Sequence, residues 1–450
     1  MHVDSWADDD GVVGLGLMTD LYELTMASSY LRRGMTEMAT FSLFARDLPH
    51  NRGFLVAAGL DDVLRLLAEY GFDDSDLTWL AEHGFDAATV DAFASLRFSG
   101  DVWAIPEGHV VLADEPLIEV TAPLPVAQLV ESLVLNQVTY QTALATKAAR
   151  CRLAARGRAS LVDFSLRRTH GIEAGIAAAR AAAIAGFAGT SNVEAARRFG
   201  IPAVGTMAHS YVLAFDTERE AFTAFACDHP DRATFLVDTY DTPGGVRNAL
   251  EVAKAMNLHG RVAVRLDSGD LLALSMQARQ ILDDAGRPDV TIIASGGLDE
   301  FDIEQLLDEH APIDVFGVGT RVGVSADAPY LDTVYKLVEY AGRPVMKLST
   351  GKQTRPGAKQ VHRSDRIDDD LLAERSEAGP RGSAALLVEV MRAGERTSTA
   401  DIAAAADRLA EDLTRLPPNA CTVREPTAPR VHVSPRLERL TRAVAEPHRV

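Results

Sequence analysis

The chain has 450 residues, enough for roughly two to three domains, and its 47% hydrophobic and 24% charged residues are close to the averages of globular proteins. This composition excludes disordered, collagen-like and coiled-coil proteins. The 64 Asp and Glu outnumber the 45 Lys and Arg, and the net charge of −19 repels nucleic acids and anionic membrane surfaces. We therefore expect a folded protein that binds neither.

Residues 1–14 are an acidic N-terminal extension without the positive and apolar segments of a signal peptide. Further along, the apolar stretch at 174–188 is interrupted by Arg180 and is shorter than a bilayer requires. The three cysteines show no CxxC spacing, so we expect neither a disulfide framework nor a zinc site. These features are typical of a cytoplasmic protein.

Residues 15–145 mix helical and strand patterns without a regular repeat, which predicts a first α/β domain. Apolar periodicity predicts helices, and short β-rich runs predict strands. The helices are expected at 21–32, 61–70, 76–82 and 127–155, and the strands at 39–44, 110–113 and 117–120.

Residues 146–329 alternate short β-rich runs with helical stretches, which predicts a parallel sheet. A capping box of Ser191 and Glu194 is expected to start one of the helices. An open doubly wound sheet also fits the alternation, but polar residues follow nearly every strand, which favours a barrel with a single mouth. Because seven strands rather than eight are found, we predict an irregular (β/α) barrel, with strands at 159–164, 186–189, 203–206, 234–237, 261–266, 291–294 and 313–318.

Residues 330–365 contain two strand-like runs around a turn at 341–344, and we expect this hairpin to complete the first domain. The C-terminal region, 366–450, ends in a stretch from residue 417 with six prolines, which predicts an extended or partly ordered tail. Four of the six lysines lie at 336–359. Either chance in an arginine-rich sequence or a phosphate site explains this cluster.

The segment VRLDSGDL (264–271) places Arg265 and Asp267 on one side of a strand end, before a turn suited to an anion, a sugar hydroxyl or a metal. Helix capping by Asp267 and Asp270 is the alternative. Glycine-rich turns follow the next two strands, in ASGG (294–297) and GVGT (317–320). Consecutive turns of this kind, late in a barrel, predict a phosphate site.

Two further motifs lie at the same predicted mouth. GTMAHS (205–210) carries His209, and although a lone histidine is more often structural than catalytic, its position at a strand end favours catalysis. FSLRRTHG (164–171) carries Arg167 and Arg168, whose adjacent guanidinium groups favour a carboxylate or phosphate ligand. Cations at a helix start oppose the helix dipole, which makes a purely structural role less favourable.

Taken together, these motifs resemble the nicotinate phosphoribosyltransferase family. The resemblance covers roughly residues 15–362 and is specific through the order and spacing of its motifs. Besides the motifs quoted above, it includes TDLYELTM (19–26), GFAGTSN (186–192), FLVDTYDT (235–242), VYKLVE (334–339) and KLSTGKQTRPGAKQV (347–361). It implies a split α/β domain around an irregular barrel.

The resemblance also implies a reaction that joins nicotinate to phosphoribosyl pyrophosphate, with ATP hydrolysis coupled through a phosphorylated histidine at position 209. Arg265 and Asp267 would be catalytic as well. Nicotinate would contact Thr206, Arg167 and Arg168, and Tyr22 would reach its ring from the neighbouring subunit of a homodimer. The residues expected at phosphoribosyl or other phosphate groups, with Mg²⁺ at Asp267, are Ser268, Gly296, Gly297, Gly317, Gly319, Thr320, Lys347, Lys352 and Thr354.

Three alternatives remain at this point. The first is a nicotinamide phosphoribosyltransferase, which the paired arginines disfavour because an amide would leave their charge unpaired. The second is a binding or scaffold protein that has kept the fold without catalysis. The third is a decarboxylating transferase acting on quinolinate, which would not need ATP.

Overall fold

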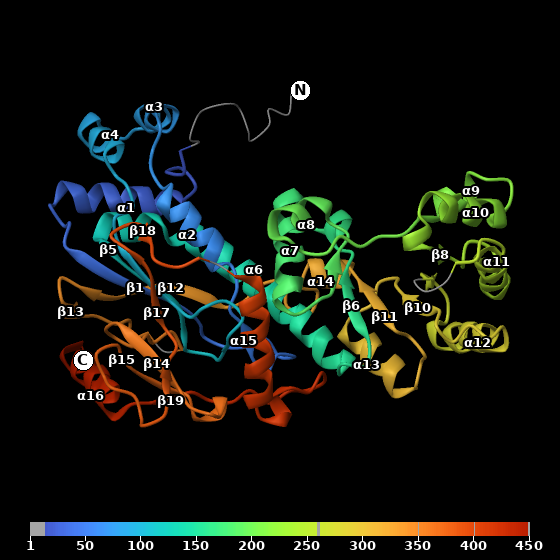
Figure 1. Cartoon of the computed structure of the whole chain (residues 1–450). Coiled ribbons are helices and arrows are strands. Elements are labelled where there is room, and N and C mark those ends of the chain that lie inside the picture. The colour runs from blue at the N-terminus through green and yellow to red at the C-terminus, as the bar shows by residue number, and fades with distance from the viewer. Residues whose placement is uncertain (1–13, 259–261, 350, 400, 449–450) are drawn as a thin grey trace.

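We describe a computed structural model of the chain, covering residues 14–258, 262–349, 351–399 and 401–448. Figure 1 shows two parts, a parallel sheet with its helices on one side and antiparallel sheets on the other. The predicted N-terminal extension lies outside the described residues except for Gly14. No helix in the described ranges is long and apolar enough to cross a membrane.

The parallel sheet has six strands in the order β7-β6-β11-β10-β9-β8, and every neighbouring pair is parallel. The first strand of this region, β6, pairs both with the next strand, β7, and with the last strand, β11. The strands therefore follow one another around a ring in chain order. Nothing in the described residues closes the ring between β7 and β8, so the sheet is a half-barrel. The strands are β6 (Ser160–Asp163), β7 (Gly189–Thr190), β8 (Thr234–Leu236), β9 (Ala263–Leu266), β10 (Thr291–Ala294) and β11 (Val315–Val318).

Six of the seven strands predicted for this region are present, and the seventh, at 203–206, is reduced to one bridge between Ala203 and Thr190. Pro202 has no backbone N–H to donate to a ladder, and Gly205 weakens strand structure, which explains the short pairing. The region carries α7 (Ile172–Ile184), α8 (Val193–Phe199), α9 (His209–Leu213), α10 (Glu218–Asp228), α11 (Thr242–Ala255), α12 (Leu271–Asp284), α13 (Glu300–Asp308) and α14 (Thr320–Gly323).

The predicted capping box at the start of α8 is wrong. Asn192 is the N-cap, and its side chain accepts a hydrogen bond from the backbone N–H of Ala195 at 3.1 Å. Asparagine is among the preferred N-cap residues, so it displaces Ser191 from the role. Glu194 pairs with Arg197 and Arg198 on the same helix instead.

The second part of the molecule is built on a seven-stranded antiparallel sheet in the order β13-β12-β1-β5-β3-β17-β18. The expected hairpin is present, but its second strand, β13, lies inside the predicted turn at 341–344 and is only two residues long. β12 pairs with β13 across Ala341 and Gly342, which both have a positive φ. β12 also pairs along the whole of β1, so segments far apart in the sequence share this sheet. The strands are β1 (Met38–Ala45), β3 (Asp101–Ala104), β5 (Pro116–Pro123), β12 (Thr333–Tyr340), β13 (Arg343–Pro344), β17 (Val388–Arg392) and β18 (Glu395–Arg396).

One long helix, α6 (Glu131–Ala155), connects the two parts. Its first half contributes Leu133 and Val138 to the core beneath the antiparallel sheet, and its second half contributes Leu144 and Ala148 to the core of the half-barrel. The predicted domain boundary between residues 145 and 146 falls inside this helix. The segment predicted as one helix at 127–155 is divided at Val130, between α5 (Leu124–Leu129) and α6.

The other N-terminal helices agree with the predicted ones to within two residues at each end. They are α1 (Leu21–Arg32), α2 (Leu60–Ala68) and α3 (Asp74–Glu82), and α4 (Ala87–Ala94) is an additional helix. A short two-stranded sheet joins β2 (Leu55–Val56) to β4 (Val110–Val111).

The C-terminal region is folded, and a helix occupies 435–445 where the sequence predicts an extended or partly ordered tail. Ser434 caps α16 (Pro435–Ala445) by accepting from the backbone N–H of Leu437 at 3.1 Å, and proline is well suited to the first helical position. The prolines of this stretch therefore begin a helix rather than prevent one. The region also contains α15 (Ile402–Arg415) and supplies most of a small sheet, β16 (Ala384–Ala385), β14 (Lys359–Arg363), β15 (Leu371–Glu374) and β19 (His432–Val433).

Candidate active site

Polar side chains from several strands of the half-barrel meet at its carboxyl-terminal edge. Parallel strands bring the residues that follow them to one edge, although those residues are far apart in the sequence. We call this group the strand-end cluster: Thr206, His209, Asp238, Arg265, Asp267, Ser268, Ser295 and Gly296.

Arg265, on β9, is the centre of the cluster. Its guanidinium donates to Asp267 Oδ1 at 2.6 Å, to Ser295 Oγ at 2.9 Å and to Thr206 Oγ1 at 3.0 Å. It also lies 5.6 Å from the centre of the Phe164 ring. Only 11% of the Arg265 side chain is exposed, so these contacts hold a positive charge in a fixed position below the edge.

Two carboxylates lie side by side in the cluster. The backbone N–H of Asp267 donates to Asp238 Oδ2 at 2.9 Å, and the hydroxyl of Ser268 donates to the same oxygen at 2.7 Å. Burial acts to raise the pKa of Asp267, but hydrogen bonds from Ser295 and Arg265 outweigh it and hold the pKa below its usual range. Asp267 is therefore a carboxylate at neutral pH.

His209 is the first residue of α9 and faces the buried Asp238. Its Nδ1 lies 3.1 Å from Thr239 Oγ1, and its Nε2 lies 3.8 Å from Asp238 Oδ1. The histidine side chain is 39% exposed, whereas that of Asp238 is 3% exposed. An exposed ring nitrogen of this kind can act as a nucleophile.

The glycines after β10, and those within and after β11, allow close packing between strand ends. At Gly296, which has a φ of +111°, a Cβ would lie 2.2 Å from the carbonyl oxygen of Asp267. A Cβ at Gly317 would lie 2.5 Å from the Phe164 ring, and one at Gly319 would lie 2.6 Å from the Phe164 carbonyl oxygen. Of these four glycines, only Gly297 has open space where a Cβ would lie. The need for glycine at the other three positions is therefore explained by packing, and their expected contacts with a phosphate stay predictions.

Arg167 and Arg168 lie in a short 3-10 helix, Leu166–Arg168, three and four residues after Phe164. Both residues are exposed. Neither guanidinium has a hydrogen bond or ion pair within the described ranges, so both are available to an anionic ligand.

Four predicted site residues lie apart from the strand-end cluster in the same chain. Tyr22 is on α1, and Lys347, Lys352 and Thr354 follow β13, in the part of Figure 1 opposite to β8 and β10. Thr354 is buried, and its Oγ1 accepts from the backbone N–H of Lys347 at 3.0 Å. Burial, Glu131 and Glu23 raise the pKa of Tyr22, so its hydroxyl stays protonated.

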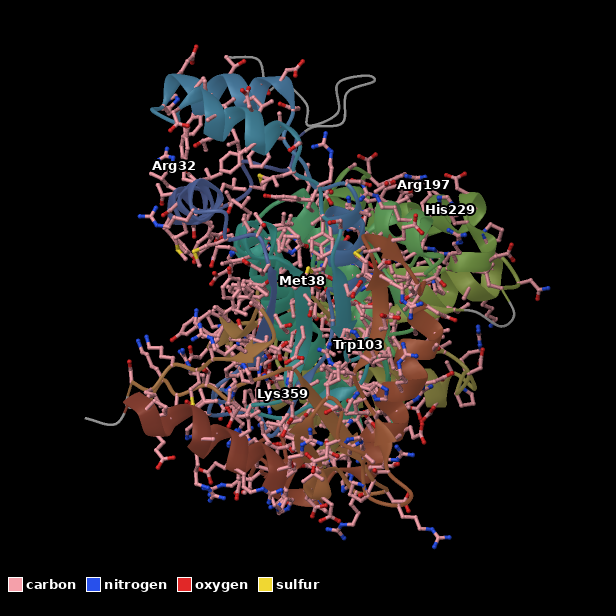
Figure 2. The ribbon with its side chains drawn as sticks, turned by 90° about the vertical axis from the view of Figure 1, so that its left-hand side faces the viewer. Arg32, Met38, Trp103, Arg197, His229 and Lys359 are labelled. Carbon is pink, nitrogen blue, oxygen red and sulfur yellow. The ribbon has the colours of Figure 1, made fainter. Side chains whose placement is uncertain are left out.

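The predicted lysine cluster is divided in the structure. Lys359 is buried with its ammonium 3.1 Å from Glu119, so its charge is already paired. Figure 2 shows Lys359 and Trp103 in the antiparallel part, whereas Arg197, on α8, and His229, directly after α10, are in the half-barrel part. Lys347 and Lys352 are exposed, and they alone of the four suit the expected role at a phosphate.

Three residues of the site were not predicted: Phe164, Asp238 and Ser295. Asp238 follows β8 directly and Ser295 follows β10, so their position after a strand was the available signal. Phe164 packs against Gly317 and Gly319 because β6 lies next to β11. That adjacency is a property of the ring order and has no local sequence signal.

The oxygen atoms around Asp238 suit a magnesium ion that is shared with a substrate. No group of three or more His, Cys, Asp or Glu within the described ranges has the geometry to hold a metal by itself. However, Asp238 Oδ1 is buried without a hydrogen-bond partner, and Asp267 and Ser268 lie beside it. Magnesium is commonly bound by one or two carboxylates together with substrate phosphates, and this donor set fits that mode.

A half-barrel with charged side chains at the carboxyl ends of its strands defines an α/β-barrel enzyme. Comparisons with known proteins agree with this class. Residues 17–139 match the N-terminal domain of nicotinate phosphoribosyltransferase, and residues 159–373 match the nicotinate phosphoribosyltransferase family.

Several relatives carry the same name. A nicotinate phosphoribosyltransferase of Mycobacterium tuberculosis is 49% identical over 388 residues, covering 84% of this chain and 82% of its own. That of Bacillus subtilis is 45% identical, covering 78% of this chain and 73% of its own. The crystal structure of human nicotinic acid phosphoribosyltransferase superimposes with a TM-score of 0.84 at 29% identity, over 95% of this chain and 100% of that one.

The chain belongs to the nicotinate phosphoribosyltransferase family. The expected identity as an enzyme of NAD biosynthesis is thereby confirmed. Family membership implies nicotinate and phosphoribosyl pyrophosphate as substrates and coupling to ATP. The expectation of an irregular barrel is confirmed in part, as a parallel half-barrel with a separate antiparallel sheet.

Proposed function

We propose that the strand-end cluster is the site at which this chain joins nicotinate to phosphoribosyl pyrophosphate, releasing pyrophosphate. The observation that carries this proposal is the contact of Arg265 with Asp267, Thr206 and Ser295, which fixes charge at the edge of the half-barrel. The transition state of ribosyl transfer is cation-like at the anomeric carbon. A carboxylate that stays charged beside that carbon stabilises it.

Arg167 and Arg168 are proposed to bind the carboxylate of nicotinate. Both guanidinium groups are exposed near the cluster, and a planar guanidinium can donate two parallel hydrogen bonds to a carboxylate. Holding the carboxylate orients the ring so that its nitrogen faces the anomeric carbon. Much of the barrier to such a reaction is removed by orientation of this kind.

The test of this function is a steady-state assay of purified wild-type chain with nicotinate or nicotinamide, with phosphoribosyl pyrophosphate, and with or without ATP. We expect a nucleotide product from nicotinate, a higher yield with ATP, and at least about a hundredfold lower kcat/KM for nicotinamide. The double variant Arg167→Gln with Arg168→Gln should lose most of this discrimination. Preference for nicotinamide, or product from quinolinate without ATP, would contradict the assignment.

His209 is proposed to accept the terminal phosphoryl group of ATP. In that step a ring nitrogen of His209 bonds to phosphorus, the bond to the ADP oxygen breaks, and later hydrolysis of the phosphohistidine releases phosphate. Nδ1 is held by Thr239, while Nε2 has no hydrogen bond in the part of the chain described here. The buried Asp238 nearby stabilises positive charge on the ring.

Asp238, Asp267 and Ser268 are proposed to hold Mg²⁺ together with substrate phosphates. When bound, the ion would neutralise phosphate charge at the leaving pyrophosphate. Asp267 and Arg265 keep their mutual contact in any such arrangement, because the Arg265 guanidinium approaches Oδ1 alone. The glycine turns at 296–297 and 317–320, with Thr320, are proposed to receive the 5-phosphate.

Tyr22, Lys347 and Lys352 are proposed to complete the site of a second copy of this chain in a homodimer, with the buried Thr354 holding the backbone of Lys347. Tyr22 is 47% exposed, and its neighbours Met18 and Leu21 are 56% and 61% exposed, which forms an apolar surface at the start of α1. Exposed aromatic and lysine side chains so far from their own cluster suit a shared site. Lys347 and Lys352 would then lie near pyrophosphate or ATP phosphates.

A complementation experiment tests the shared site. Chains carrying Tyr22→Ala and chains carrying Asp267→Asn should each be almost inactive alone. Co-expressed in equal amounts, they should regain about a quarter of wild-type activity, since half of the dimers are mixed and each mixed dimer has one intact site. An active monomer in light scattering, or no recovery in mixed dimers, would rule out this arrangement.

A further inference from the structure

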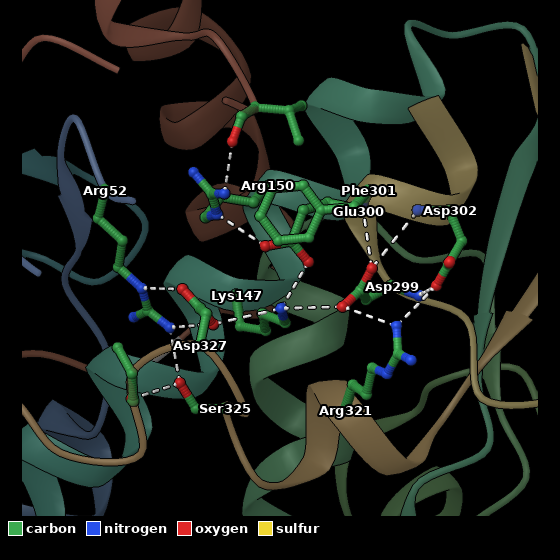
Figure 3. A network of polar contacts seen from close by, with 12 residues as sticks. Arg52, Lys147, Arg150, Asp299, Glu300, Phe301, Asp302, Arg321, Ser325 and Asp327 are labelled. Carbon is green, nitrogen blue, oxygen red and sulfur yellow. Dashed lines mark hydrogen bonds and ion pairs between the residues drawn. The ribbon is translucent and has the colours of Figure 1, made fainter. Parts of the chain in front are cut away.

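A buried network of charged side chains lies between α6 and the starts of α13 and α14 (Figure 3). Four cationic side chains face four carboxylates, so the network is neutral as a whole. We call it the junction network: Arg52, Lys147, Arg150, Arg321, Asp299, Glu300, Asp302 and Asp327.

Lys147, on α6, is the most central cation of this network. Its Nζ lies 2.6 Å from Glu300 Oε2, 3.2 Å from Asp327 Oδ1 and 3.8 Å from Asp299 Oδ2. The side chain is 1% exposed. Burial acts to lower the pKa of Lys147, but Glu300 and Asp327 outweigh it and raise the pKa, so the ammonium is charged.

Asp299 connects Lys147 to the two glycine turns. It follows the 295–297 turn, caps α13 by accepting from the backbone N–H of Phe301 at 3.0 Å, and lies 3.1 Å from Arg321 Nη1. Arg321 directly follows Thr320 in the second glycine turn and also reaches Asp302 at 2.8 Å. The ion pair between Asp299 and Arg321 therefore joins the two turns. Lys147 contacts Asp299 from the side opposite to Arg321 (Figure 3).

We propose that Lys147 is a positioning residue for the phosphate-binding turns, acting through Asp299 and Arg321. This inference rests on the proposed function, which places the 5-phosphate of phosphoribosyl pyrophosphate at these turns. Lys147 does not itself contact substrate. It fixes the start of α13 and balances the carboxylates that lie under the anion site.

The effect of removing Lys147 follows from the charges. Without its ammonium, the network would hold three cationic side chains against four carboxylates. Asp299, Glu300 and Asp327 would then place uncompensated negative charge beneath a site for a phosphate, and like charges disfavour the anion. Nicotinate is proposed to bind at the arginine pair after β6, whose guanidinium groups have no hydrogen bond or ion pair with this network in the described residues, and its binding should be affected much less.

The experiment compares wild type, Lys147→Met and Lys147→Arg by steady-state kinetics and by thermal unfolding. For Lys147→Met we expect the KM for phosphoribosyl pyrophosphate to rise about tenfold or more, with the KM for nicotinate within about twofold of wild type. Lys147→Arg, which keeps the charge, should restore most of the phosphoribosyl pyrophosphate KM. A role limited to stability would lower Tm without separating the two KM values.

A second variant covers the case in which Lys147→Met does not fold. Arg321→Gln removes the ion pair between the turns at a side chain that is 47% exposed, and we expect the same selective rise in KM. The matched control is Arg156→Met, because Arg156 also joins α6 to α13, through Asp308 at 2.5 Å, but at the far end of α13. This control should leave both KM values unchanged.

The outcomes separate this inference from the function on which it rests. If the wild-type chain makes no nicotinate nucleotide, the proposed function fails. If the wild type is active but Lys147→Met and Arg321→Gln change both KM values equally, or neither, the positioning role is wrong and the function stands.

Discussion

Replacing Asp267 with asparagine should lower kcat by about 10²-fold to 10³-fold, while the chain stays folded. Asparagine has nearly the same shape and can still accept from Arg265 and Ser295, which approach Asp267 Oδ1. What would be lost is the negative charge that we propose stabilises the developing positive charge of the ribosyl group. An interaction made mainly in the transition state lowers kcat rather than raising KM.

The pH dependence of wild type gives a second measure of Asp267. The pKa of Asp267 is held below its usual range. Its negative charge is therefore fully present above the ordinary carboxyl pKa of about 3.9 and is lost only as the pH falls through the lowered pKa. Asp267 itself should therefore cause no loss of activity between neutral pH and about pH 5. The Asp267→Asn variant should show the same profile in that range at a lower level.

Asp270→Asn is the matched control for this substitution. Asp270 lies three residues further along and caps α12 by accepting from the backbone N–H of Ala273 at 3.1 Å. Asparagine is an equally good N-cap, so kcat and Tm should remain close to wild type. If Asp270→Asn and Asp267→Asn reduce kcat equally, Asp267 is a structural residue and the proposed catalytic role is wrong.

Replacing His209 with asparagine should abolish the coupling of ATP hydrolysis to product formation. Asparagine can still hydrogen-bond to Thr239 but has no nucleophilic nitrogen. We expect ATP to stimulate wild type about tenfold or more and to have no effect on the variant. Turnover of the variant without ATP should stay within about threefold of wild-type turnover without ATP. His229→Asn serves as the control, because His229 is an exposed histidine at the end of the nearby helix α10.

The fold was predictable where the pattern is local. The periodicity at 21–32 predicts α1 residue for residue, and the run at 291–294 predicts β10 in the same way. The helix α16 was missed because a proline-rich composition was taken as extended structure, whereas Pro435 occupies the one helical position that suits it. The strand predicted at 203–206 is reduced to one bridge next to Pro202 and Gly205, so the sheet is open between β7 and β8. The sequence pattern did not show how short this pairing would be.

The site was predictable where its residues are neighbours on one strand. Arg265 and Asp267 are two residues apart at the end of β9, so their contact follows from the period of a strand. Asp238 joins them from 29 positions away, and Arg150 meets Glu300 from 150 positions away. Such contacts depend on which strands and helices become neighbours, and nothing in the local sequence specifies that.

The central claim is that His209, at the edge of the half-barrel, carries the phosphoryl group that couples ATP to nucleotide formation. Mass spectrometry of the intact chain and its peptides after incubation with ATP tests it most directly. We expect an acid-labile phosphate on His209 in wild type and His229→Asn, its loss when nicotinate and phosphoribosyl pyrophosphate are added, and none in His209→Asn. Phosphate on another residue, or a label on His209 that persists through turnover, would contradict the account.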